Sequence, residues 1–455
     1  MKKERIHLSE HFGYRKLVRF VLPSVVMMVF VSIYGIVDGL FVSNYVGNTP
    51  FAALNLIFPL IMILGAVGFM LGVGGNAVVS KLLGEKNEKK ANSIFSMLIY
   101  TTVVLGAILS VVGIVIARPV AEIFAENEKN MSIEQKTELV NYCVLYARTI
   151  LCVLPLFMLQ NAFQGFFVTA EKPRLGLFVT LLAGCTNILL DTLFVAVFGW
   201  GLFGAALATA ISQSVGGIIP VVYFVRKNDS LLRLGKTKME WGTLGKVCIN
   251  GSSELITNIS LSVVAMLYNA QLMRLEGIIG VSAYGIMQYI GFIFVSVFLG
   301  YAVGSSPITG YHYGAKNHAE LQNIFKKSLI LTALVGTLMT GFAIAMAGPF
   351  SWIFANKDKE LLALTTRGMR IYSVFYLACG LNIFASAFFT ALGNGGVSLL
   401  ISFSRTFLLQ VLAVLILPIF WGTNGVWISF TVSEGLALIL TGFLFVGLRK
   451  RYHYA

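Results

Sequence analysis

The stretch FVLPSVVMMVFVSIYGIVDGLFVSNYV, residues Phe20–Val46, decides the fold class. About 20 apolar residues in a row are enough to cross the hydrocarbon core of a membrane as one helix. The stretch nevertheless carries one acid, Asp38, and one proline, Pro23. A charged side chain inside hydrocarbon is expensive and is usually retained for function. We therefore expect this helix to be the moving part of an ion-coupled transporter. Tyr34 precedes Asp38 by one helical turn, so its hydroxyl could donate a hydrogen bond to that acid.

The composition of the whole chain is that of an integral membrane protein. Of its 455 residues, 57% are hydrophobic and 12% are charged, whereas soluble domains carry about 25% charged residues. Runs of apolar residues predict an all-α protein with twelve transmembrane helices. We expect these spans near residues 17–42, 51–80, 92–117, 140–168, 175–198, 202–225, 245–272, 281–305, 322–347, 365–391, 396–419 and 425–447.

The formal net charge of +14 reflects membrane topology rather than binding of nucleic acid. The basic residues lie in short segments between apolar runs, with 24 Lys and Arg on the side of the N-terminus and 9 on the other side. Because cytoplasmic loops carry the excess of Lys and Arg, both termini are expected in the cytoplasm. An even number of spans independently requires the two termini to share a side.

The two halves of the chain resemble each other. GVGGNAVVSKLLGEKN at Gly72–Asn87 is answered 230 residues later by AVGSSPITGYHYGAKN at Ala302–Asn317. Likewise, WGLFGAALATAISQ at Trp200–Gln213 is answered 221 residues later by WGTNGVWISFTVSE at Trp421–Glu434. We therefore expect two pseudo-symmetric six-helix lobes, with substrate bound between them, as is common in transporters built from repeats. The expected domains are residues 1–225, a cytoplasmic linker loop at 226–246, and residues 247–455.

Polar residues inside the N-terminal spans suggest a site for a coupling ion. Asp191 follows Asn187 by one helical turn, and Asp38 lies in another span of the same lobe. Asn161 and Thr209 could complete the cluster. Two carboxylates that approach each other in a medium of low dielectric constant cannot both stay ionised. Such a group can bind and release a proton, or hold Na⁺ at Asp38 and Asp191 through oxygen ligands. The alternative is a permanently satisfied polar cluster that only holds helices together.

Two further acids lie within spans of the C-terminal half. Glu254 is either a first-turn acid favoured by the helix dipole, beside a serine N-cap, or a second coupling or substrate-binding residue. Glu434 is expected to form a structural ion pair with Arg405, the one Lys or Arg deep inside a span. Three other residues are candidate contacts in a substrate cavity: Gln164, Met287 and Gln288.

In these features the chain resembles the multidrug and toxic compound extrusion (MATE) family, in its DinF-like and MepA-like bacterial branch. The resemblance covers essentially the whole chain and rests on the order of its motifs. These motifs are Pro23, Tyr34-x-x-x-Asp38, the turns at Gly84 and Gly314, Asn187-x-x-x-Asp191, and Asn250-Gly-Ser-Ser-Glu254.

The resemblance implies a V-shaped, two-lobed antiporter that alternates between inward-open and outward-open states. In DinF-like members the cation site is formed by residues that match Asp38, Asp191, Asn187, Asn161 and Thr209, with Tyr34 adjoining. Protonation of that site is coupled to bending of the first span at its proline, here Pro23. The expected span at 365–391 contains no acid, so a NorM-type sodium site in the C-terminal lobe is not expected.

From these observations we expect a multidrug efflux antiporter in the plasma membrane of a bacterium. Protons, or Na⁺, would run inward while organic, cationic amphiphiles run outward; no cofactor is expected, and the protein is expected to be a monomer in the lipid bilayer. One alternative is a lipid-linked saccharide flippase, which should line its cavity with cations for pyrophosphate. The other is an integral-membrane enzyme, which would need a nucleophile–base pair or a metal cluster. The five histidines all lie near the termini or in one loop, away from the spans.

Overall fold

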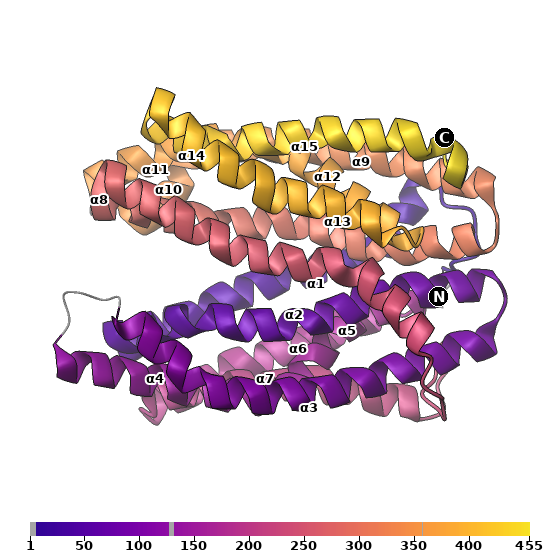
Figure 1. Ribbon diagram of the computed structural model, residues 1–455, viewed down its shortest axis with the longest axis horizontal. Helices are drawn as coiled ribbons and strands as arrows, with labels where there is room; N and C mark the ends of the chain where they lie inside the picture. Colours follow the sequence, from indigo (N-terminus) through magenta and orange to yellow (C-terminus); the bar gives the residue numbers. More distant parts are fainter. Residues whose placement is uncertain (1–5, 127–131, 357) are drawn as a thin grey trace. The chain divides into compact units, whose positions relative to one another are not determined.

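The computed structural model describes residues 6–126, 132–356 and 358–455, and within these ranges every regular element is a helix (Figure 1). The chain divides into two compact units. Unit 1 comprises Phe30–Gly251, and unit 2 comprises Ile6–Val29 together with Ser252–Ala455. Helices α1 (Tyr14–Phe41) and α8 (Trp241–Gly314) each contribute to both units. The all-helical fold expected from the sequence is confirmed.

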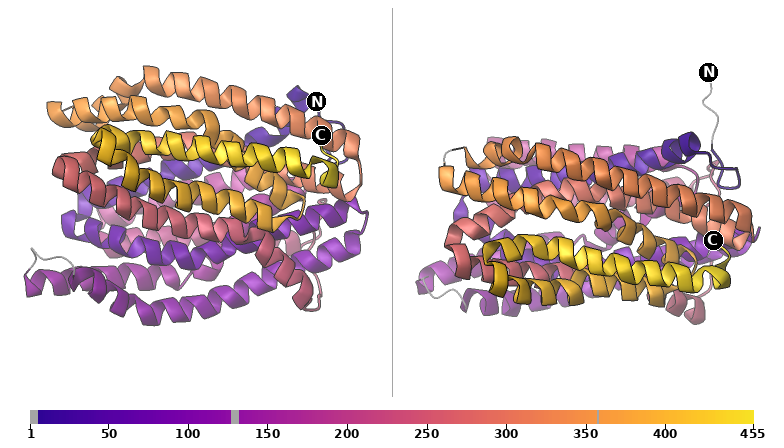
Figure 2. Two further views of the ribbon diagram at one scale, coloured as in Figure 1. Left: turned by 45° about the horizontal axis from the view of Figure 1, so that its top comes forward. Right: turned by 90° about the horizontal axis from the view of Figure 1, so that it is seen from above.

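Each unit is a bundle of long helices and short helical segments. The other elements of unit 1 are η1 (Val42–Val46), α2 (Asn48–Gly84), α3 (Glu88–Glu126), α4 (Ile133–Leu151), α5 (Leu154–Thr169), α6 (Pro173–Asp191), η2 (Thr192–Val197) and α7 (Gly201–Val225). Those of unit 2 are α9 (His318–Ala345), α10 (Ala347–Ala355), α11 (Lys359–Tyr372), η3 (Ser373–Phe375), α12 (Tyr376–Ala391), α13 (Gly395–Phe403), η4 (Ser404–Leu408), α14 (Leu409–Trp421) and α15 (Thr423–Tyr452). Figure 2 shows the orange and yellow helices of unit 2 running side by side.

The twelve expected spans all correspond to helices. In the described residues, 10 helices are long and apolar enough to cross a membrane, and α4 with α5, which meet at an angle of 57°, are long and apolar enough when taken together. Helix α8 covers two expected spans, because Gly277 interrupts it with a non-helical backbone (φ 64°, ψ −148°). A positive φ with an extended ψ is almost confined to glycine, so this residue allows the chain to reverse between two spans.

The unit boundaries differ from the expected domain boundaries. The first part of α1, up to Val29, belongs to unit 2, and the first part of α8, up to Gly251, belongs to unit 1. The segment 226–246, expected to be a separate linker, is part of unit 1 because it is bound to α3. Backbone N–H groups of Arg233 and Gly235 donate to the Asn92 side chain at 2.6 Å and to the Ser96 hydroxyl at 3.0 Å.

Glycines allow these exchanged helix segments to pack closely against their units. In unit 1, a Cβ on Gly251 of α8 would lie 1.9 Å from the Met70 carbonyl oxygen, so α2 and α8 touch backbone to backbone. In unit 2, a Cβ on Gly300 would lie 2.4 Å from the Cα of Val25 in α1. Small residues permit this kind of approach between helices in membranes.

The repeat seen in the sequence is also a repeat in backbone conformation. Lys86 and Lys316, which occupy equivalent places in the two Gly-x-Lys-Asn turns, both adopt a positive φ, 59° and 53°. The following asparagines then begin the next helices: Asn87 Oδ1 accepts from the Lys90 N–H at 3.2 Å, and Asn317 Oδ1 accepts from the Glu320 N–H at 3.1 Å. Equal turns at equal places support two structurally related halves.

The two ends of the described chain meet the same end of α9 in unit 2. The Asn323 side chain donates to the Phe12 carbonyl oxygen at 3.0 Å, and the Gln322 side chain donates to the His453 carbonyl oxygen at 3.3 Å. Phe12 and His453 thus lie at the same end of α9.

Candidate functional site

The residues expected to bind the coupling ion come together in unit 1, where the last turns of α1 and α6 meet α7. The Thr209 hydroxyl donates to Asp38 Oδ1 at 3.4 Å and accepts from Asn187 Nδ2 at 3.4 Å. Asp38 also interacts directly with the side chains of Asp191 and Asn187. The structure therefore brings Asp38 of α1 together with Asn187, Asp191 and Thr209, which follow it by about 150 residues or more in the sequence.

Asp191 is the most deeply buried member of this cluster, with no exposed surface. Neither of its carboxylate oxygens meets an N–H or O–H donor among the described residues, and the group that faces them is the Asp38 carboxyl. Two ionised carboxylates only accept hydrogen bonds, so this pair can be bonded only when one of them carries a proton. The Oδ1 atom of Asn187 is also buried without a donor. These free oxygens fit a proton, and they also suit a hard cation that prefers oxygen ligands.

The backbone changes from α-helical to π-helical directly after Asp191. Helix α6 ends at Asp191, and the chain continues as the π-helical segment η2 at Thr192. An extra residue in a helical turn redirects the side chains beside it, and such segments are frequent at functional sites.

Tyr34 belongs to this region, but its hydrogen-bond partner is not the expected one. Its hydroxyl interacts with the side chain of Gln160 in α5 rather than donating to Asp38. Gly184 in α6 makes room for this part of α1, because a Cβ there would lie 2.4 Å from the Phe30 ring and 3.0 Å from the Tyr34 ring. Gln160 was missed in the sequence analysis, where its only signal was an amide inside an apolar span.

Asn161 is not joined to the cluster by any hydrogen bond between the residues that the structure describes. Its Nδ2 atom is buried without an acceptor. It follows Gln160 directly on α5, so it points about 100° away around the helix from the residue that contacts Tyr34. Of the six residues expected at the site, the structure thus joins four by hydrogen bonds, places Tyr34 beside them in contact with Gln160, and leaves Asn161 apart.

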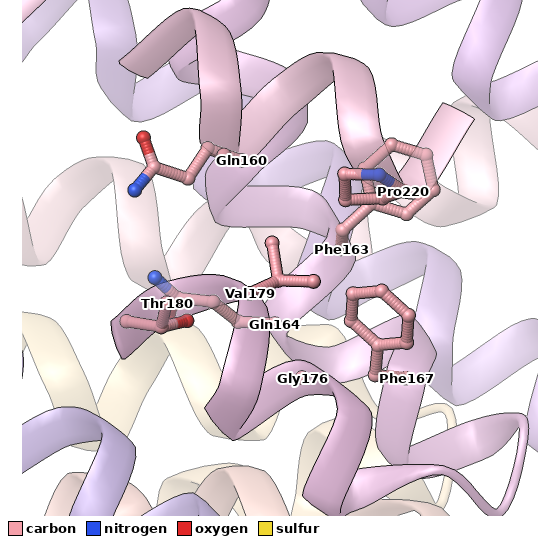
Figure 3. Close-up of a pocket in the computed structure, with 9 residues that line it drawn as sticks. Gln160, Phe163, Gln164, Phe167, Gly176, Val179, Thr180 and Pro220 are labelled. Carbon is pink, nitrogen blue, oxygen red and sulfur yellow. The ribbon is translucent and has the colours of Figure 1, made fainter. Parts of the chain in front are cut away.

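A small pocket inside unit 1 adjoins Gln160 (Figure 3). Helices α5, α6 and α7 line it with Gln160, Phe163, Gln164, Phe167, Gly176, Val179, Thr180, Gly216 and Pro220. Figure 3 shows the polar ends of Gln160, Gln164 and Thr180 on one side, and the rings of Phe163, Phe167 and Pro220 on the other. Gln164, expected at a substrate cavity, thus lines a pocket within one unit.

Unit 2 contains a separate buried ionic network, and the expected pair of Arg405 with Glu434 is confirmed. Arg405 Nη1 donates to Glu434 Oε1 at 3.0 Å. The other carboxylate oxygen accepts from Asn382 Nδ2 at 2.7 Å, and Asn382 Oδ1 accepts from the Thr441 hydroxyl at 2.9 Å. Both oxygens of Glu434 are hydrogen-bonded within this network, although Arg405 Nε is buried without an acceptor among the described residues, and the network has the character of a structural support. The deep cation in unit 2 is neutralised.

Of the two alternatives for Glu254, the one that makes it a first-turn acid beside a serine N-cap is wrong. Helix α8 begins at Trp241, so Glu254 lies more than three turns inside it and no serine beside it is an N-cap. Glu254 instead lies within electrostatic range of Arg405. The other two cavity candidates also lie in unit 2: Met287 is 1% exposed in the core, and Gln288 accepts from the Tyr372 hydroxyl at 3.4 Å.

Pro23 lies within α1, which continues through it as a helix. A proline has no N–H, so the carbonyl of Arg19, four residues earlier, loses its partner within the helix. This weak point lies in the part of α1 that belongs to unit 2, whereas Asp38 lies in the part that belongs to unit 1.

Comparisons with known proteins agree with this architecture. The family model MatE matches residues 23–193 and 255–416. "Multidrug export protein MepA" of Staphylococcus haemolyticus is 24% identical over 454 residues, covering 99% of this chain and 97% of that protein. A crystal structure of MATE in complex with MaL6 has a TM-score of 0.89 at 22% identity, covering 98% of both chains. The outward-facing conformation of a multidrug resistance MATE family transporter of the MOP superfamily has a TM-score of 0.87 at 23% identity, covering 98% of this chain and 97% of that one.

The structural neighbours share the helical fold, and the family model covers most of the chain in two segments, one in each half. With the fold, the repeat and the family model in agreement, the chain belongs to the MatE family of transporters.

Proposed function

We propose that this protein is a multidrug efflux antiporter of a bacterial plasma membrane, with both termini in the cytoplasm. Protons, or Na⁺, move inward through the Asp38 cluster while organic cations move outward. The observation that carries the proposal is the pair of acids, Asp38 and Asp191, which face each other in an apolar bundle. The family relationship and the export function in the name of the MepA relative support it.

The interaction between Asp38 and Asp191 depends on whether they share a proton, and this dependence can couple ion binding to a change of conformation. With one proton between the two carboxyls, Asp38 and Asp191 attract each other and hold the end of α1 to α6. Without that proton, two negative charges repel each other in a medium where charge interactions are strong. Binding or release of the proton therefore changes the free energy of the conformation in which the end of α1 lies against α6. A ligand shifts a conformational equilibrium only through such a difference in affinity between states.

An organic cation can take the place of the proton in this scheme. A positively charged amphiphile compensates the two carboxylates as a proton or Na⁺ does, so drug and ion compete for the same charge. The many Phe and Met side chains of the chain, 35 and 15, supply apolar surface that adapts to ligands of varied shape. We propose that the protein acts as a monomer.

Transport in everted membrane vesicles tests the proposal. Everted vesicles that contain the protein should accumulate the fluorescent cation ethidium when the driving ion is concentrated in the lumen, because that ion then flows out toward the cytoplasmic face in exchange for ethidium. A proton gradient and a sodium gradient are imposed separately, each with an ionophore control. Accumulation with the proton gradient alone assigns H⁺ as the coupling ion, and accumulation with the sodium gradient alone assigns Na⁺. Ethidium uptake that needs neither gradient would overturn the antiport mechanism.

A further inference from the structure

The pocket of unit 1 connects, through two side chains, to the acid cluster. Gln160 lines the pocket and also interacts with Tyr34. Tyr34 in turn lies one helical turn from Asp38 on the same face of α1. Tyr34 and Gln160 therefore place polar groups between the acids and the pocket, inside a bundle that is otherwise apolar; Tyr34 is next to Asp38 along α1 but is not hydrogen-bonded to it in the described residues.

The pocket lies on the side of the cluster that faces the cytoplasm in the expected topology. Asp191 is the last residue of α6, and Gly176 in the pocket is in its first turn. These residues are 15 positions apart, or about 22 Å along the helix axis. The basic residues Lys172 and Arg174 flank the start of α6, which the topology assigns to the cytoplasmic side. The pocket thus spans part of the depth between the acids and that surface.

The lining of the pocket has hydrogen-bonding capacity that the protein does not use. Gln160 is 7% exposed, yet its Oε1 atom has no donor among the described residues. Pro220 has no N–H, so the carbonyl of Gly216, one turn earlier in α7, does not receive the usual helical hydrogen bond from position 220. Both Gly216 and Pro220 line the pocket. Buried acceptors of this kind are normally satisfied by an internal water molecule.

The geometry around Gln160 keeps this space open. A Cβ on Gly216 would lie 2.6 Å from the amide carbon of Gln160, so the glycine lets the amide pack directly against α7 beside the pocket. The pocket has room for about one water molecule at its centre.

We propose that this pocket is a water site on the path by which the coupling proton leaves the Asp38 cluster for the cytoplasm. The proton passes from the carboxyl of Asp38, past the hydroxyl of Tyr34, to a water held by Gln160, and that water releases a proton toward the cytoplasmic ends of α6 and α7. Gln160 is a positioning residue, because it holds the water and carries no charge itself. The inference rests on the proposed function for its direction of flow, but the water site stands without it.

Rapid hydroxyl-radical footprinting tests the water site independently of transport. X-ray radiolysis of a trapped water labels the side chains beside it, even when they are closed to bulk solvent. Phe163 and Phe167 line the pocket and are 1% and 2% exposed. Phe166, on the same helix and 1% exposed, does not line the pocket and is the matched control. We expect fast labelling of Phe163 and Phe167 but not of Phe166; equal and slow labelling of all three would overturn the water site.

Proton flux in proteoliposomes tests the path. A pH-sensitive dye in the lumen reports protons that move when ethidium is added. Gln160→Leu should slow this flux roughly tenfold, which corresponds to the loss of about one hydrogen bond. Drug-for-drug exchange, which moves no net proton, should continue at the wild-type rate. Thr186→Val is the control, because its exposed hydroxyl bonds only to the Leu182 carbonyl of its own helix, at 2.8 Å.

The outcomes separate the two proposals. If the wild type moves protons and Gln160→Leu moves them at the same rate, the path through the pocket is overturned but proton antiport is not. A wild-type protein that exports drug without moving protons overturns proton antiport and the proton path together. If Gln160→Leu does not fold, Thr180→Val, which removes a different polar group from the pocket, is measured in its place and should slow proton flux in the same selective way.

Discussion

Arg405 Nη1 lies 3.0 Å from Glu434 Oε1 in the interior of unit 2, and the acid side chain is only 3% exposed. Breaking a buried ion pair by removing one partner destabilises a protein by about 3–5 kcal/mol, because the other charge is left uncompensated. We therefore expect Glu434→Gln to lower the thermal unfolding midpoint and the yield far more than the activity per folded molecule. The measurements are unfolding in detergent and transport normalised to folded protein.

A double variant is the control for this prediction. Arg405→Met combined with Glu434→Leu removes both charges together, so much of the lost stability should return. A Glu434→Gln protein that is made in full amount but does not transport would contradict the structural role.

Asp38→Asn should abolish ion-driven transport while leaving the fold intact. The amide keeps the size of the side chain and its interaction with Thr209, but it cannot bind and release a proton at neutral pH. The measurement is ethidium uptake in proteoliposomes under an imposed ion gradient, with gel filtration as the check on folding. Asp229→Asn, which alters an acid paired with Lys172 at 2.8 Å outside the spans, should transport normally. Undiminished transport by Asp38→Asn would remove this acid from the mechanism.

Pro23→Ala should slow transport without preventing ion binding. Alanine restores the N–H that the Arg19 carbonyl lacks, so α1 becomes harder to bend at this point. We expect the maximal rate of drug export to fall while the dependence on ion concentration stays near that of the wild type. Pro59→Ala in α2, another proline inside a helix of the first half, is the comparison variant. Equal rates for Pro23→Ala and the wild type would show that bending at Pro23 is not needed.

Gly251→Ala should strongly impair folding. The added Cβ would lie 1.9 Å from the backbone oxygen of Met70, and neither helix can yield without moving its backbone. Overpacking of this kind costs about 1–3 kcal/mol. Gly245→Ala on the same helix has open space around its Cβ and serves as the control. Similar yields and unfolding midpoints for the two variants would show that α2 and α8 separate easily at this crossing.

The N-terminal segment should show a dependence of stability on pH that Glu10 controls. A hydrogen bond with Lys16 and another from the His7 N–H, at 2.9 Å, hold the pKa of the Glu10 carboxyl below its usual value of 4.5. A lowered pKa in the folded state means that the ionised acid stabilises the fold above pH 4.5, and that this contribution is lost as the pH falls through the lower folded value. We expect unfolding midpoints in acid to decline less in Glu10→Gln than in the wild type. Parallel curves for the two proteins would show that this acid makes no such contribution.

The sequence predicts the elements of this fold well. A backbone that crosses lipid must form all its hydrogen bonds internally, and long apolar helices are the usual structure that does so. The pairing of Arg405 with Glu434 was also predictable, since two opposite charges in neighbouring spans have few other partners. The first-turn alternative for Glu254 failed because α8 begins at Trp241, before the expected start of the span at residue 245 and well before the serines that could have served as N-caps. Gln160 was missed because an amide in an apolar run is less unusual than an acid.

The division into units was beyond what the sequence could show. Whether the first part of α1 packs with the first or the second half depends on close contacts such as that of Val25 with Gly300. These residues are far apart in the chain, and apolar helices carry little information about their partners. The linker was misjudged for a related reason: its basic composition signals topology, whereas its hydrogen bonds to Asn92 and Ser96 depend on backbone groups.

The exchange of helix segments has a consequence for how this protein can be made. Unit 1 includes the start of α8, and unit 2 includes the start of α1. A gene cut within the segment 226–246 would thus give two polypeptides that each lack a piece of their own bundle and carry a piece of the other's. Such fragments should be degraded when produced singly and should recover only when co-expressed, by mutual complementation.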